Sequence, residues 1–178
     1  MADPLGSNFI EGVLGVVQMY FDGIDLGKTL DEATLEFIED IKDIMFAQNG
    51  TQPADKIPTG QAYQITANFA QRTWARLEKL LRGVTVVGNS AKLGVDLYRS
   101  GYDNFAKQLI LYRVDSDGVV STSPIYRLVM YKAMPTVSGP IATFGPDTQQ
   151  QVTVTFYCFK DTTKNAFGYS GYASSLGL

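Results

Sequence analysis

The chain has 178 residues, 45% of them hydrophobic and 19% charged, which fits one globular domain with a sizeable core. It contains no histidine and a single cysteine, Cys158, which excludes a Ser-His-Asp triad, a His-ligated metal site and an intrachain disulfide. The net charge is −3, no apolar run reaches the roughly 18 residues that span a bilayer, and no signal-peptide pattern opens the sequence. We therefore expect one domain over residues 1–178, not placed in a membrane.

The first part of the chain predicts an irregular arm, a strand and an ambiguous segment. Residues 1–12 form the expected N-terminal arm. Residues 15–22 are typical of a short apolar strand, and Asp22-Gly23 predicts a turn after it. Residues 34–45 fit both a helical stripe and an alternating strand, so periodicity alone does not decide between them.

A long polar loop is predicted over residues 46–60. An Asn-Gly pair, two prolines and a closing glycine interrupt this segment, and all of these residues favour turns. Loops of more than about 12 residues are uncommon in compact domains and usually have a function or no fixed structure. The loop is therefore a candidate contact surface.

A strand and the one clear helix of the chain are predicted next. In residues 61–70, every second side chain is apolar, which predicts a half-buried strand. Residues 71–83 predict a flanking α-helix that ends at Gly83. Its predicted buried stripe includes Trp74, Leu77 and Leu81.

From residue 93 onward the pattern is one of β-strands, predicted over residues 93–99, 107–114, 125–134 and 150–159. The last of these strands alternates most regularly. Several short strands with one interposed helix indicate a mainly β fold, an antiparallel sandwich or small barrel. Residues 166–178 are rich in Gly, Ser and Tyr and predict a C-terminal arm whose tyrosines dock on a partner.

Charge is divided unevenly along the chain. Residues 1–70 carry three lysines and eleven carboxylates, a net charge of −8, whereas residues 71–178 carry twelve basic and seven acidic groups, a net charge of +5. An acidic segment does not attract nucleic acid. It forms either a solvated face or a surface that pairs with the basic part of a neighbouring copy.

No motif predicts an enzyme. Asp115-Ser116-Asp117-Gly118 starts like a calcium loop, but Val119 and Tyr126 stand at later ligand positions, so a hairpin turn is expected. A cluster of carboxylates has the side chains of a glycoside hydrolase, but a solvated or pore-lining face is favoured. Cys158 lies in an apolar strand and is expected in the core. We expect no cofactor and no metal. The clustered carboxylates are Glu36, Glu39, Asp40 and Asp43.

Taken in order, these features resemble the bacteriophage tail tube (major tail) protein family over roughly residues 13–170. The most similar part is the segment from Ala47 to Gly60, followed by an alternating strand and the helix. The features that carry the resemblance are the strand at residues 16–21, the acidic segment 34–45, the loop 46–60, the strand 62–70, the helix 73–81, the strand 150–159 with Lys160-Asp161, and Phe167-Gly168.

The resemblance implies a β-sandwich or small barrel and favours a strand over residues 34–45, with a bulge near Ile38-Glu39-Asp40. It implies that six copies form a ring, that rings stack into a tube through the long loop, and that DNA passes through the lumen. The implied stacking residues are Asn49, Gly50, Thr51, Pro53, Asp55, Lys56 and Pro58. The implied lumen-facing residues are Glu36, Glu39, Asp40 and Asp43.

The partners implied by the resemblance are further copies of the chain, the tape-measure, tail terminator and baseplate proteins, and a sheath where the tail has one. DNA would pass without sequence-specific binding, and the subunits would assemble in the bacterial host cytoplasm into the virion tail. Alternatives are a tail terminator, baseplate or connector ring protein, a carbohydrate-binding β-sandwich and a carboxylate hydrolase. A tube subunit stacks on copies of itself, whereas a terminator stops at one ring.

Overall fold

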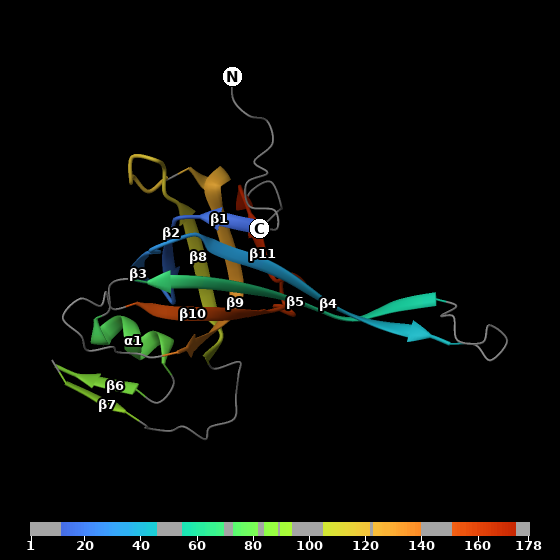
Figure 1. Cartoon of the computed structure of the whole chain (residues 1–178), viewed down its shortest axis with the longest axis horizontal. Coiled ribbons are helices and arrows are strands. Elements are labelled where there is room, and N and C mark those ends of the chain that lie inside the picture. Colours follow the sequence, from blue (N-terminus) through green and yellow to red (C-terminus); the bar gives the residue numbers. More distant parts are fainter. Residues whose placement is uncertain are drawn as a thin grey trace.

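The structure is a computed structural model in which nearly all regular segments are antiparallel strands (Figure 1). It describes residues 12–45, 55–69, 73–81, 84–88, 90–93, 105–121, 123–139 and 151–173. The strands are β1 (Gly12–Gly15), β2 (Val17–Phe21), β3 (Ile24–Lys28), β4 (Ala33–Ile44), β5 (Asp55–Phe69), β6 (Val84–Val87), β7 (Ser90–Leu93), β8 (Lys107–Arg113), β9 (Arg127–Ser138), β10 (Val152–Phe159) and β11 (Gly168–Ser170). The helices are α1 (Trp74–Leu80) and the 3₁₀ turn η3 (Pro124–Tyr126).

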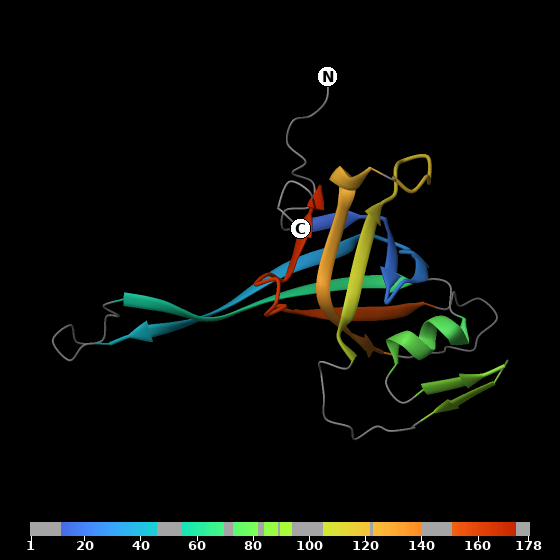
Figure 2. The ribbon, with the colours of Figure 1, turned by 180° about the vertical axis from the view of Figure 1, so that it is seen from behind.

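The body of the molecule is one sheet that curls on itself. Its strand order is β1-β4-β5-β10-β9-β8-β2-β3, and β11 is an additional partner of β9. Only Val16 separates β1 from β2, yet β1 pairs with β4 and β2 pairs with β8. Gly15, with φ of +71°, provides the bend between them. This bent strand brings the two ends of the sheet together, and Figure 2 shows β8 and β9 crossing steeply over β4, β5 and β10. The mainly β prediction is confirmed.

The core lies inside this curled sheet. Every second residue of β10 is buried there, as the alternating sequence predicts: Val152, Val154, Phe156 and Cys158. Phe156 contacts Phe21 of β2 with ring centroids 5.7 Å apart, although two strands separate β10 from β2 in the sheet order. The contact therefore joins opposite walls of the barrel across its interior.

Helix α1 packs against β3 and β9 at the end of the barrel that lies away from β1 (Figure 1). Leu77 and Leu80 belong to the core, and Leu81 packs on it while partly exposed. Ion pairs of 3.9 Å from Arg76 to Asp25 and 3.6 Å from Lys79 to Asp22 tie the helix to the β2–β3 hairpin. The sequence prediction of a buried leucine stripe is thus correct for Leu77. The side chain of Trp74 lies outside the described residues.

The helix is shorter than predicted. Thr73 is its N-cap, and its side chain accepts a hydrogen bond from the backbone N–H of Arg76. The chain becomes extended at Leu81, so the helix ends before the predicted stop at Gly83. Gly83 itself lies outside the described part of the chain, as do Gln71 and Arg72.

The structure confirms a strand and two turns that we expect from the sequence, but it also contains short strands that the sequence patterns miss. Residues 34–45 are strand up to Ile44, as the family resemblance favours. The Asp22-Gly23 turn is present, and both residues have positive φ, as in a type I′ hairpin. The Asp115–Gly118 segment is a turn closed by a 2.8 Å hydrogen bond from the Gly118 N–H to the Asp115 carbonyl. The sequence patterns do not predict the short strands β3, β6 and β11, and they include only the last residues of β1 and β7, Gly15 and Leu93.

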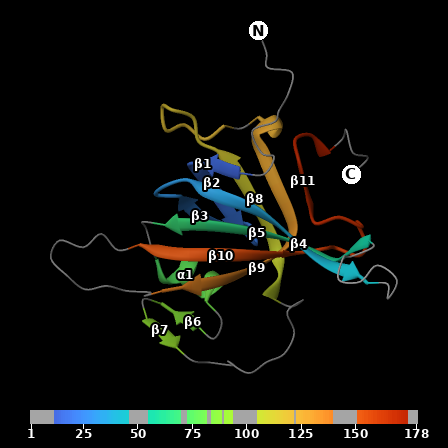
Figure 3. The ribbon, with the colours of Figure 1, turned by 45° about the vertical axis from the view of Figure 1, so that its right-hand side comes forward.

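The predicted loop over residues 46–60 is wrong in its second part. Residues 55–60 belong to β5 and pair with β4, because Ile57 and its neighbours continue the cross-strand ladder as far as Ile44–Asp55. The predicted C-terminal arm is likewise wrong over residues 168–170, which form β11 on the chain's own β9 (Figure 3). Residues 174–178 and residues 1–11 of the N-terminal arm lie outside the described part, as do residues 94–99 of a predicted strand.

We expect Leu77→Ala to lower the free energy of unfolding by about 2–5 kcal/mol, as other large-to-small core substitutions do. Leu77 is only 3% exposed and joins α1 to the core. Denaturant titration followed by circular dichroism measures the change. Ala75, on the exposed side of the same helix, provides the control Ala75→Ser. A loss no larger than that of this control would show that the helix does not pack as described.

Candidate functional site

A two-stranded arm projects from the body of the molecule (Figures 1 and 2). Pairing between β5 and β10 ends at Tyr63–Cys158, whereas pairing between β5 and β4 continues to Asp55–Ile44. We call residues 38–44 of β4 and 55–62 of β5 the arm. At roughly 3.3 Å per residue, it reaches about 20 Å beyond the sheet.

A bulge interrupts the arm beside Asp40, near the position that the family resemblance implies, but its extra residue lies on β5 and not on β4. Asp40 pairs with Gly60 and Ile41 pairs with Pro58, so Thr59 is an extra residue on β5. The Thr59 hydroxyl donates a 3.1 Å hydrogen bond to the Asp40 carbonyl. Pro58, which has no backbone N–H to contribute to the ladder, stands next to this irregularity, where proline is tolerated in a strand.

The arm exposes isoleucines on both of its faces. Ile41 is 55% exposed and lies opposite Pro58 on one face. Ile57 is 47% exposed and lies opposite Lys42 on the other face. A two-stranded ribbon of this kind is at best marginally stable in water by itself.

The predicted lumen-facing carboxylates are all exposed, but they do not share one face. Side chains alternate along β4, so Glu36 and Asp40 lie on one face while Glu39 and Asp43 lie on the other. Glu39 accepts a 3.2 Å hydrogen bond from Gln61, and Asp43 forms a 3.6 Å ion pair with Lys56. No group of three or more metal-ligating side chains occurs among the described residues. Because the carboxylates are divided between the two faces of β4, they do not converge as a carboxylate hydrolase would require.

The predicted stacking residues are divided between the described and the undescribed parts of the chain. Asp55, Lys56 and Pro58 lie in the arm and not in a loop. The others, Asn49, Gly50, Thr51 and Pro53, lie outside the described residues.

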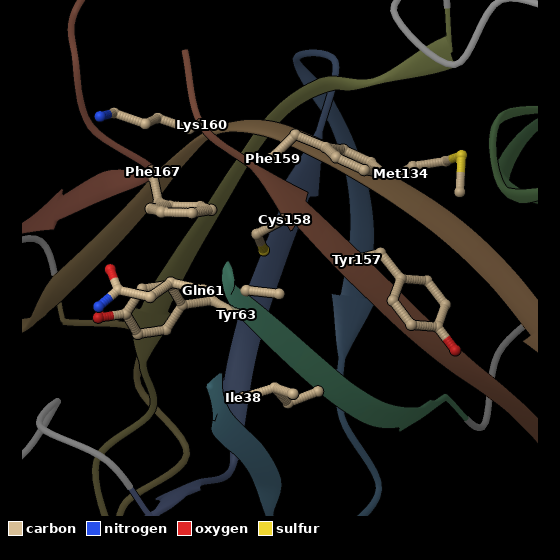
Figure 4. A pocket seen from close by; sticks show the side chains of 10 residues that line it. Ile38, Gln61, Tyr63, Met134, Tyr157, Cys158, Phe159, Lys160 and Phe167 are labelled. Carbon is tan, nitrogen blue, oxygen red and sulfur yellow. The ribbon is translucent and has the colours of Figure 1, made fainter. Parts of the chain in front are cut away.

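A groove of about 620 Å³ opens at the base of the arm, where β5 diverges from β10 (Figure 4). Its lining is mostly apolar and comes from strands β4, β5, β9 and β10 and from the segment before β11. The lining residues are Ile38, Gln61, Ala62, Tyr63, Met134, Tyr157, Cys158, Phe159, Lys160 and Phe167. No sequence pattern predicts this groove, because residues far apart in the chain form it.

A row of aromatic rings supports the groove at the base of the arm. Phe37 of β4 contacts Tyr63 of β5 with ring centroids 5.1 Å apart, and Tyr63 contacts Phe167 at 5.2 Å. Phe167 is held in place because β11 follows it directly on β9. A Cβ on Gly168 would lie 2.1 Å from the Val129 carbonyl oxygen, so only glycine permits this close approach.

One lysine lines the groove, and a cluster of charged side chains lies around Asp161, which follows it in the chain. Lys160 is part of its lining, and Lys132 and Lys164 lie close to the neighbouring Asp161. Desolvation acts to raise the pKa of Asp161. The backbone N–H groups of Thr163 and Lys164, together with these two lysines, outweigh it and lower the pKa overall. The groove therefore combines a mostly apolar lining with one lysine, Lys160, which precedes the charged cluster around Asp161 in the chain.

No family model matches the sequence, and no curated protein is significantly similar to it. Among the described residues, no helix is long and apolar enough to cross a membrane. The arm, the groove and their charges are therefore the features from which a function can be inferred.

We expect the Cys158 thiol to resist labelling in the folded protein. Its residue is 3% exposed, and burial raises the pKa of the thiol to about 12, so it stays protonated at pH 8. A colorimetric thiol reagent at pH 8 is expected to react slowly with native protein and rapidly in denaturant. Rapid reaction of the native protein would mean that the floor of the groove opens readily.

Proposed function

We propose that this chain is a structural subunit that assembles with copies of itself, and that the assembly is a phage tail tube. The observation that carries the proposal is the projecting arm, with isoleucines exposed on both faces. The body of the molecule does not cover these faces. A partner that buries them removes apolar surface from water, which stabilises the complex by about 25 cal/mol per Å².

The backbone of the arm supports the same proposal. Among the described residues, β5 has no partner over residues 55–62 on the edge that pairs with β10 over residues 63–69, and β1 pairs with β4 only over Ala33–Leu35. Both edges of the described arm thus carry unpaired backbone groups, which invite pairing with another strand. Edge-to-edge contacts between subunits would continue the sheet from one copy to the next.

The division of charge favours copies of the same chain as partners. In the arm and its base, residues 36–44 and 55–62 hold five carboxylates and two lysines. The described residues from 105 onward hold six basic and three acidic groups. An acidic arm that meets a basic body on the next copy gives a head-to-tail contact, and such contacts repeat into rings or tubes.

In this proposal six copies form a ring, the rings stack, and DNA passes along the lumen. The tape-measure, terminator and baseplate proteins, and a sheath in contractile tails, are the proposed further partners. The second candidate is a terminator or baseplate ring of similar fold, which the same projecting arm also supports. Negative-stain microscopy of the purified protein separates them, since tubes support a tail tube and single rings support a terminator. A chain that stays monomeric at every concentration contradicts both.

We expect Ile41→Asp to weaken assembly and leave the fold intact. Ile41 is exposed in the single chain, so the substitution costs little stability there. Burying one isoleucine is worth about 1.5–3 kcal/mol, so the concentration at which assembly begins should rise at least about tenfold. Sedimentation velocity measures this concentration, and circular dichroism checks the fold.

Val119→Asp is the matched control, because Val119 is 62% exposed in the turn between β8 and β9, far from the arm (Figure 1). Assembly of this variant should equal that of the unmodified chain. If Ile41→Asp assembles as readily as Val119→Asp, Ile41 is not part of a subunit contact.

A further inference from the structure

We infer that the groove at the base of the arm receives the Ile41–Pro58 face of the arm of a second copy of this chain. The inference rests on the proposed self-assembly and adds which two surfaces meet. The arm face, the groove and the charges around them support it.

The Ile41 face of the arm has an apolar centre that lies between two polar pairs. Within each pair, the two side chains interact with one another. Ile41 and Pro58 lie opposite one another at the centre. On one side Gln61 donates to Glu39 at 3.2 Å, and on the other side Lys56 pairs with Asp43 at 3.6 Å. Because these polar groups already have partners within the arm, removing water from this face costs little free energy. Burial of Ile41 and Pro58 supplies the favourable free energy of docking.

The groove suits such an apolar centre. Its volume of about 620 Å³ lies within the range of pockets that enclose ligands. Ile38, Tyr157 and Phe159 are lining residues with substantial exposure in the single chain. In Figure 4, Cys158 lies below Phe159 and above Gln61 and Tyr63, and the Tyr157 ring lies apart from them on the right. An isoleucine and a proline that enter the groove would exclude water from both surfaces.

Charge complementarity sets the orientation of the incoming arm. The arm is acidic overall: Glu39 and Asp43 lie on the Ile41 face, and Asp40 and Asp55 lie with Lys42 on the other. The charged residue in the groove lining is the basic Lys160. Such complementarity raises the association rate and fixes register more than it raises affinity. Lys160, as a groove residue, is the rim group placed to meet an incoming carboxylate.

The occupant is a second copy because the arm of the same chain points away from its own groove. Ile38 at the base of the arm lines the groove, and Ile41 lies three residues farther out along a paired strand, about 10 Å away. The apolar centre and the groove are therefore different surfaces of one chain. Contacts between two different surfaces are heterologous and build rings or filaments.

Cross-linking between single-cysteine variants tests the inference. In a Cys158→Ala background, which removes the sole native thiol, we would mix Ile41→Cys with an affinity-tagged Tyr157→Cys and add a short bismaleimide. Tyr157 lines the groove and is exposed, so its thiol is accessible before assembly. Tagged Val119→Cys is the control partner, and circular dichroism and microscopy check the fold and assembly of each variant.

We expect the Ile41–Tyr157 product to exceed the Ile41–Val119 background several-fold. If assemblies form but the two yields are equal, the groove assignment is wrong while self-assembly stands. If Ile41→Cys instead cross-links mainly to itself, the arms meet each other and the assignment is also wrong. If no variant and no unmodified protein assembles, the inference fails together with the proposed function.

Discussion

Strand β5 pairs with β10 over residues 63–69, whereas over residues 55–62 its one partner among the described residues is β4. The architecture depends on this divergence of β5 from β10. Over residues 63–69, β5 is a central strand that pairs with β10 and lies beside β4. Over residues 55–62 it is half of the arm, which has open edges and exposed isoleucines. A ribbon of this kind needs a partner to be stable, and the same divergence opens the groove that we assign to that partner.

The rest of the fold holds the base of the arm in a fixed position. The bent β1–β2 strand curls the sheet, and the Phe21–Phe156 contact joins its walls across the core. Helix α1 packs into the core with Leu77 and Leu80, on the side of the body away from the arm (Figure 2). At the base of the arm, Tyr63 packs between Phe37 and Phe167. The structure therefore presents the ribbon from a packed support, which lowers the entropy lost on docking.

The sequence predicts the mainly β fold well where one face of a strand is buried. In β10, the alternation of Val152, Val154, Phe156 and Cys158 follows directly from burial of one face. In β4 the same rule fails beyond Phe37, because the strand leaves the body and both of its faces are exposed. Residues 34–45 are therefore ambiguous in sequence and regular in the structure.

Turn-forming residues explain why the predicted loop over residues 46–60 is wrong in its second part. Pro58 and Gly60 favour a loop, but the bulge at Thr59 accommodates the proline, and the side chain of Asp40 lies against Gly60. Strand β11 has only three residues, one of which is a glycine, so its pairing with β9 depends on tertiary contact. The groove combines side chains from residues 38 to 167, and no local sequence pattern predicts such a convergence.

Amide hydrogen exchange of the arm in the assembled and dissociated states tests the central claim most directly. In dissociated chains, the amides on the open edges of residues 38–44 and 55–62 should exchange quickly, while those of β10 stay protected. On assembly, we expect exchange in the arm to slow markedly, because a neighbouring copy covers it. Arm amides that exchange at the same rate in both states would contradict the account.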